Sequence, residues 1–335
     1  MRSQVVIAIS LATLAACGGS STSDSAEVTA PAPTRPASAS APSTTTGTTD
    51  EPTEQPADTT ATTDAEEPAP TESDSVSLPP SDFYGDYSLD DTDFGTRVTV
   101  SVNGATRTIQ TNALPDHETG DFPNAGNPNA ITAQNLTWEY PTSPIMAAAP
   151  SEPLVPGVAI NGVKFEPGTA ETTECASGEV YRVEGLQDTF DLGMDFNNAH
   201  VQPTGEYHYH GFADLLLEKH PSGEDLVHLG FAADGHLIYH SISDRWSSGY
   251  ALSNQPRTGT DCTPSLRGAA TIDLDGTMPD GTYTSDWVWS ADNGDLDECN
   301  GITVNGEYIY LITDDYPFIS RCLMGEYTER RVPPR

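Results

Sequence analysis

Basic side chains are scarce in this sequence. Its 335 residues contain 14 lysines and arginines against 50 aspartates and glutamates, so the formal net charge at pH 7 is −36. A surface of this sign repels phosphate groups and anionic lipid headgroups. Nucleic acid is therefore excluded as a partner, and we interpret the acidity mainly as a source of solubility.

Long apolar runs are also missing, and the run at the N-terminus is short. It covers residues 5–14, follows Arg2 and ends in Leu14-Ala15-Ala16-Cys17. Such a run is too short for a transmembrane helix but is typical of a cleaved signal peptide. The small residues before Cys17 match the cleavage site of bacterial lipoproteins; an ordinary secretory signal is the alternative. We predict a signal peptide over 1–17, lipidation of Cys17 and lipid anchoring to a membrane of the cell envelope.

Large apolar residues are almost absent from residues 18–80, which consist mainly of Ser, Thr, Ala, Pro, Asp and Glu. A segment of this composition cannot bury enough surface to offset the entropy lost on ordering. We predict a disordered linker over 18–80 that tethers a globular domain over 81–335.

Cysteine is sparse as well. Apart from Cys17 there are four, namely Cys175, Cys262, Cys299 and Cys322. An even number in an exported domain favours two disulfides, whereas a four-thiolate zinc site would need closely spaced cysteines. Proximity along the chain favours the pairs Cys175–Cys262 and Cys299–Cys322.

Several catalytic motifs are missing too. The sequence contains no glycine-rich phosphate loop, no Gly-x-Ser-x-Gly elbow and no alternating β-α pattern. Short strand patterns are frequent instead, and Asn-Gly turns divide two of them, at Asn103-Gly104 and Asn161-Gly162. We predict an all-β or β-dominated, hairpin-rich, sandwich-like domain with one short helix over 213–220. Strands are expected at 96–102, 105–111, 157–165, 237–242, 283–289 and 308–312.

Three histidines cluster in the stretch AHVQPTGEYHYHG. The triplet Pro203-Thr204-Gly205 suits a three-residue hairpin loop, which would place His200 opposite His208. His210 follows two residues later on the same face, whereas Tyr207 and Tyr209 point to the other face. A two-residue loop would instead place His200 opposite Tyr207, so the inference depends on loop length.

Three imidazoles on one strand face suit a transition metal. His200, His208 and His210 could occupy three corners of a tetrahedron around Zn or Cu and leave one position open. Histidines that hydrogen-bond to their neighbours in a structural role are the alternative. We predict that the tyrosines pack inward and make the strand rigid.

An acidic segment, Asp295-Leu296-Asp297-Glu298-Cys299-Asn300-Gly301, provides further candidates. Its carboxylates could bind Ca, although the EF-hand spacing is absent. Asp297 or Glu298 could also complete the histidine cluster as a ligand or general base. An acidic loop held by a disulfide is the simpler interpretation.

The stretch NNAHVQPTGEYHYHGF resembles the signature of the YHYH domain family of exported bacterial proteins. The resemblance continues through GFAADG at 230–235, DLDECNG at 295–301 and TDDYPFI at 313–319, and it covers about 158–326. It implies a domain and its extent, but no reaction.

Two classes of function remain open. The first is a metal-binding extracytoplasmic protein, with or without catalysis at the open coordination position. The second is a non-catalytic surface module that recognises an unknown small molecule or surface ligand through Tyr207, Tyr209 and Trp246.

Overall fold

The folded domain begins slightly earlier than the sequence predicts. The computed structural model describes residues 77–328 and 331–332, so the predicted signal peptide, Cys17 and the linker up to residue 76 lie outside the described residues. Leu78 packs against the domain and Pro79 is buried, although both fall within the predicted linker. No helix in this part of the chain is long and apolar enough to cross a membrane.

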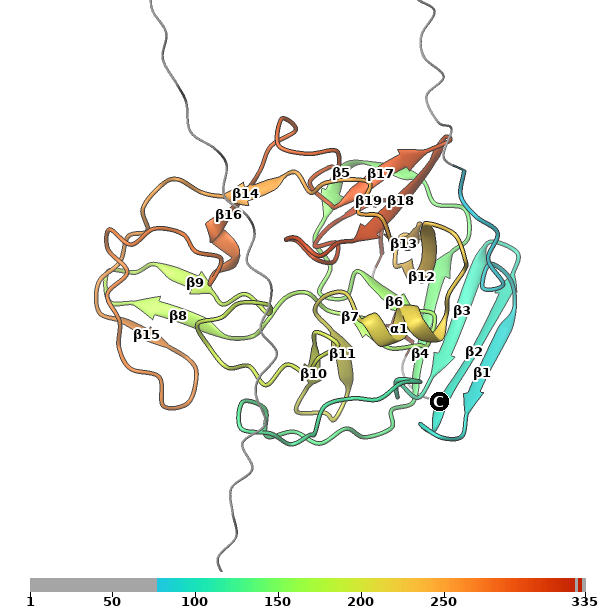
Figure 1. The fold of residues 1–335 in the computed structure, drawn as a ribbon, viewed down its shortest axis with the longest axis horizontal. Coiled ribbons are helices and arrows are strands. Elements are labelled where there is room, and N and C mark those ends of the chain that lie inside the picture. Colours follow the sequence, from blue (N-terminus) through green and yellow to red (C-terminus); the bar gives the residue numbers. More distant parts are fainter. Residues whose placement is uncertain (1–76, 329–330, 333–335) are drawn as a thin grey trace, which may run out of the picture. The chain divides into compact units, whose positions relative to one another are not determined.

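Strands dominate the fold, as the turn chemistry predicts. The predicted hairpin forms, but its two-residue loop is Gly104-Ala105 rather than Asn103-Gly104, because Asn103 pairs with Thr106 at the end of the first strand. Gly104, at the first loop position, has the positive φ of 60° that a glycine there allows. Buried and exposed residues alternate along the first of these strands, with Val98 and Val100 facing the core. Together with β4 they form most of an antiparallel sheet (Figure 1). Its strands, in order, are β1 (Tyr87–Asp91), β2 (Thr96–Asn103), β3 (Thr106–Thr111), β4 (Leu136–Pro141) and β20 (Arg331–Val332).

A mixed sheet of eight strands carries the histidine hairpin. The predicted turn at Asn161-Gly162 joins two of its strands, and the hairpin of β10 and β11 forms one edge (Figure 1). The strands, in order, are β10 (Ala199–Val201), β11 (Tyr207–Tyr209), β7 (Lys164–Phe165), β6 (Gly157–Ala159), β12 (Leu226–Ala232), β13 (Leu237–Ser241), β18 (Glu307–Ile312) and β17 (Gly301–Val304). Two neighbouring pairs are parallel, β11 with β7 and β13 with β18.

Smaller elements complete the described residues. The predicted short helix is α1 (Asp214–Lys219), which ends before Pro221. The predicted strand over 283–289 is only half a strand, because its first part forms the 3-10 helix η1 (Thr284–Asp286). Three minor sheets contain β14 (Tyr250–Leu252) with β16 (Trp287–Trp289), β15 (Cys262–Pro264) with β8 (Thr172–Cys175) and β9 (Val180–Arg182), and β19 (Leu323–Gly325) with β5 (Met146–Ser151).

One apolar core joins the two large sheets. It contains Val98 and Trp138 from the five-stranded sheet and Phe165, Tyr209 and Phe231 from the eight-stranded sheet. The sheets therefore share a core, as a sandwich-like arrangement requires. The tyrosines of the histidine hairpin belong to this core, which fixes the direction in which the histidines point.

Candidate metal centre

The hairpin forms with the loop length on which the histidine cluster depends. Gly205 has a φ of 83°, and its N–H donates to the Gln202 carbonyl at 2.8 Å. The N–H of Gln202 donates to the Glu206 carbonyl at 3.0 Å. His200 therefore lies directly opposite His208, which confirms the predicted register.

The three imidazoles converge through the same ring nitrogen. Nε2 of His210 lies 3.0 Å from Nε2 of His208 and 3.2 Å from Nε2 of His200. The ligand atoms of His200, His208 and His210 all lie within 4.8 Å of one another, close enough to hold one ion. Among the described residues, no other group of three or more His, Cys, Asp or Glu side chains does so. Tetrahedral zinc with Zn–N bonds of about 2.0–2.1 Å places ligand nitrogens about 3.3 Å apart, close to these separations.

The other ring nitrogens are held by the backbone. Each Nδ1 faces a main-chain carbonyl, in the pairs His200–Leu192 at 2.9 Å, His208–Glu206 at 3.4 Å and His210–Pro167 at 3.4 Å. A carbonyl oxygen can only accept, so these contacts favour the tautomer in which each Nδ1 carries the proton and each Nε2 keeps its lone pair. A carbonyl that orients a ligating histidine in this way is the usual second layer of a metal site.

Burial keeps all three imidazoles neutral. It lowers the pKa of His200, and it lowers the pKa values of His208 and His210 well below the usual range. The neighbouring imidazoles lower the pKa values of His208 and His210 further. At pH 7 three lone pairs therefore point at one another with no proton between them, an arrangement that a cation would relieve.

Loops cover the histidine face, so it is not a surface. His208 and His210 are each only 1% exposed, and His200 is half-buried. Gly185 is packed so closely against His210 that a Cβ there would lie 2.5 Å from Nδ1. The sequence predicted which residues share this face, but it did not predict the segments that bury it.

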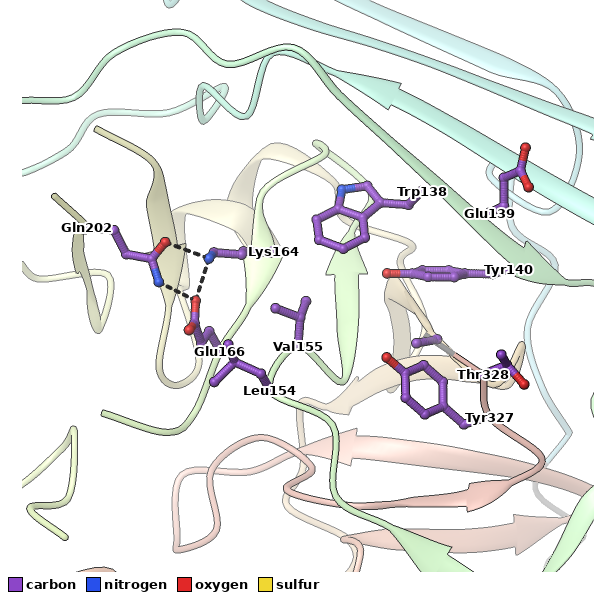
Figure 2. Close-up of a pocket in the computed structure, with 11 residues that line it drawn as sticks. Trp138, Glu139, Tyr140, Leu154, Val155, Lys164, Glu166, Gln202, Tyr327 and Thr328 are labelled. Atoms are coloured by element: carbon purple, nitrogen blue, oxygen red, sulfur yellow. Dashed lines mark hydrogen bonds and ion pairs between the residues drawn. The ribbon is translucent and has the colours of Figure 1, made fainter. Parts of the chain in front are cut away.

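The polar face continues beyond the histidines onto β7. Lys164 lies opposite His208 in the parallel pairing, so the two share a face. Lys164 forms ion pairs with Glu166 and with Glu206, the latter at 3.6 Å, and donates to Gln202 at 2.8 Å. Lys164, Glu166 and Gln202 also line a pocket of about 130 Å³ next to Trp138 and Tyr140 (Figure 2).

The opposite face of the hairpin is aromatic and fully buried. Tyr207 and Tyr209 are 0% exposed, as the inward orientation predicts. The hydroxyl of Tyr207 donates to Asp195 at 2.8 Å, and that of Tyr209 lies 2.6 Å from His117 Nε2. This burial overturns the hypothesis that these tyrosines recognise a surface ligand. The partner His117 was missed, because no local pattern links it to the hairpin.

The acidic segment is not part of the histidine cluster. Asp297 accepts hydrogen bonds from the N–H groups of Cys299 and Gly301, both at 2.9 Å, and from the Tyr308 hydroxyl at 2.7 Å. Its carboxylate therefore organises the loop, and Glu298 lines a separate cleft. Nothing in this geometry favours a calcium site or a fourth ligand from Asp297 or Glu298.

The remaining cysteines pair as predicted. The disulfides are Cys175–Cys262 and Cys299–Cys322. The first links adjacent strands β8 and β15, and the second fixes the end of the acidic segment.

Comparison with known proteins identifies one family. The sequence profile described as YHYH protein matches residues 137–325, more than half of the chain. The match begins earlier than the resemblance over 158–326 and so includes all but the first residue of β4 and the whole of β5. No curated protein matches the chain, and no solved structure does.

Proposed function

The chain belongs to the YHYH protein family, and we propose that it binds one transition-metal ion, zinc or copper, through His200, His208 and His210. One observation carries this proposal: three Nε2 atoms converge while every Nδ1 faces a carbonyl. The fold thus orients three neutral lone pairs towards one point. Nitrogen ligands of this kind suit zinc and copper.

The proposed site has the donor set of a catalytic rather than a structural centre. Structural zinc sites use four protein ligands, whereas three histidines leave a position for water or a substrate. A metal at that position would supply Lewis acidity and lower the pKa of bound water. The chain's own contribution is to orient the imidazoles and to exclude bulk water.

Elemental analysis of the purified full chain tests the proposal. We expect about one zinc or copper per chain, and a rise in Tm when metal is restored to chelated protein. Single replacements of His200, His208 or His210 by Gln should each lower the metal content. The matched control is His236→Gln, because His236 is also buried and also faces a carbonyl, that of Tyr308, but lies outside the cluster.

The proposal fails if the wild-type chain contains no stoichiometric metal and added Zn or Cu leaves its Tm unchanged. It also fails if His236→Gln lowers the metal content as much as the cluster variants do. Either result would assign the histidines a structural role.

We also propose that the protein is a lipoprotein anchored in the cell envelope through Cys17. The support is the short apolar run before Leu14-Ala15-Ala16-Cys17. The Cys17→Ser variant should be recovered in the soluble fraction and should not incorporate labelled palmitate. Membrane fractionation with retained label would refute the anchor.

A further inference from the structure

A cleft separate from the histidine cluster has the features of a ligand site. Its volume is about 570 Å³, within the range of 300–1,000 Å³ typical of small-molecule sites. Pro167 forms part of its wall, and the carbonyl of the same residue faces Nδ1 of His210. None of the three histidines lines the cleft, which therefore adjoins the segment that orients His210 without containing the cluster.

Three aromatic rings form one wall of the cleft. Trp287 stacks on Tyr316, with ring centroids 4.6 Å apart and an angle of 5° between planes. Tyr250 meets Tyr316 edge-on at 5.0 Å. Tyr316 is buried beneath the other two, which remain half-buried in the cleft wall. Trp287 and Tyr250 can therefore still contact the apolar face of a ligand.

Charges of both signs line the same cleft. Its guanidinium groups are Arg182 and Arg321, and its carboxylates are Glu152 and Glu298. Arg321 already pairs with the buried Glu184 at 2.5 Å. An anionic ligand would thus meet two carboxylates and only one guanidinium without such a partner. A cationic ligand would be repelled by both guanidinium groups.

The walls are held in place before any ligand binds. The hydroxyl of Tyr250 donates to the Glu298 carbonyl at 2.8 Å, and that of Ser248 donates to the Tyr316 carbonyl at 2.5 Å. The Cys299–Cys322 disulfide fixes the two segments that carry Glu298 and Arg321. Little ordering remains to be done on binding, which favours affinity.

We propose that this cleft binds a neutral oligosaccharide. A purely apolar ligand would desolvate four charged side chains without pairing them. A neutral polyhydroxylated ring both donates and accepts hydrogen bonds, so it satisfies guanidiniums and carboxylates together. The C–H face of the same ring packs on Trp287 and Tyr250. This function is independent of metal binding at the histidines.

Titration of the purified full chain with trisaccharides tests the proposal. The neutral probes are maltotriose, cellotriose and triacetylchitotriose; the charged comparisons are trigalacturonic acid and chitosan trimer. We expect at least one neutral probe to bind by calorimetry and to change the tryptophan fluorescence. Arg182→Gln and Glu298→Gln should each weaken binding by about 10-fold, as loss of a hydrogen bond to a charged group does.

Trp287→Phe should abolish most of the fluorescence response, whereas the control Trp138→Phe, in the core and outside the cleft, should leave the affinity unchanged. Chelation of metal should not alter the affinity. The proposal is wrong if no neutral trisaccharide binds at millimolar concentration, if a charged trimer binds more tightly, or if the cleft variants bind like wild type.

Discussion

Gly185 lies where a side chain would displace the imidazole of His210, one of the three proposed metal ligands. A Cβ at this position would be 2.5 Å from Nδ1 and 3.0 Å from Cγ of His210. Gly185→Ala should therefore tilt the imidazole and lower metal affinity by about 10- to 100-fold, as loss of orienting contacts does. Competition with a chelator of known affinity measures the change.

Gly85→Ala is the matched control for this substitution. No atom lies within 4 Å of a Cβ built at Gly85, so this variant should bind metal like wild type. Equal affinity of Gly185→Ala and wild type would show that His210 does not hold the ion.

The hydroxyl of Tyr209 supports the hairpin from the opposite face. It lies 2.6 Å from His117 Nε2 and accepts from Asn161 at 2.9 Å. Tyr209→Phe removes the partner of the buried His117 Nε2 and should cost about 1–3 kcal/mol of unfolding free energy, although Asn161 keeps its hydrogen bond to Asp116. Tyr207→Phe should cost less, because its partner Asp195 also accepts from the Gly120 N–H. Urea denaturation of both variants checks the order, and a larger loss for Tyr207→Phe would contradict it.

At the scale of the element, the three-residue loop sets the register of β10. This strand is at the edge of the sheet, whereas β11 is also held by β7. Deleting Thr204 should let β10 slip by one residue and turn His200 to the aromatic face. We expect folded protein with metal affinity reduced at least as much as in His200→Gln.

A glycine inserted between Asn103 and Gly104 is the control, because it perturbs the β2–β3 turn and leaves the hairpin intact. Circular dichroism shows whether each variant folds, and elemental analysis measures its metal content. A folded deletion variant with full metal content would refute the dependence on register.

Local chemistry explains which elements could be predicted. Pro203-Thr204-Gly205 and the two Asn-Gly turns act over a few residues, so the hairpins and the shared face of His200 and His208 followed from spacing alone. The prediction of a strand over 283–289 is wrong in its first half, where the 3-10 helix η1 forms instead. There the Asp286 carboxylate accepts a hydrogen bond from the Tyr283 N–H at 3.0 Å and stabilises η1. A side chain that caps a turn overrides β propensity there.

Contacts between distant segments could not be predicted. Alternation places Lys164 in β7 and Glu166, directly after β7, on one face, but only the parallel pairing of β7 with β11 brings that face to the histidines. The carbonyls of Leu192 and Pro167 are invisible in sequence, since every residue has one. The disulfide pairs were predicted from proximity, yet Cys175 and Cys262 are 87 residues apart and meet through β8 and β15.

For the whole molecule, buried neutral histidines make stability depend on pH. Burial lowers the pKa of His228 to about 3 and also lowers that of His117. Below about pH 6.5 the unfolded chain binds protons that the folded chain does not, so stability falls as pH falls. We expect the urea midpoint of chelated protein to decrease steadily from pH 7 to pH 4.5.

His228→Gln, which does not titrate, should reduce this slope by up to about 1.4 kcal/mol per pH unit. A matched replacement of His236, also buried, controls for the loss of an imidazole. A midpoint that stays constant over this range would contradict the expectation.

The burial of the three histidines bears on the rate of metal exchange rather than on the affinity. His208 and His210 are 1% exposed and His200 is half-buried, so the folded chain restricts the access of an ion to the three nitrogens. An ion bound at the proposed site would enter and leave when the loops that carry Pro167, Gly185 or Leu192 open, and such openings are local unfolding events. Exchange of the metal should therefore be slow and follow the rate of loop opening. The ion would be acquired most readily while the chain is still folding.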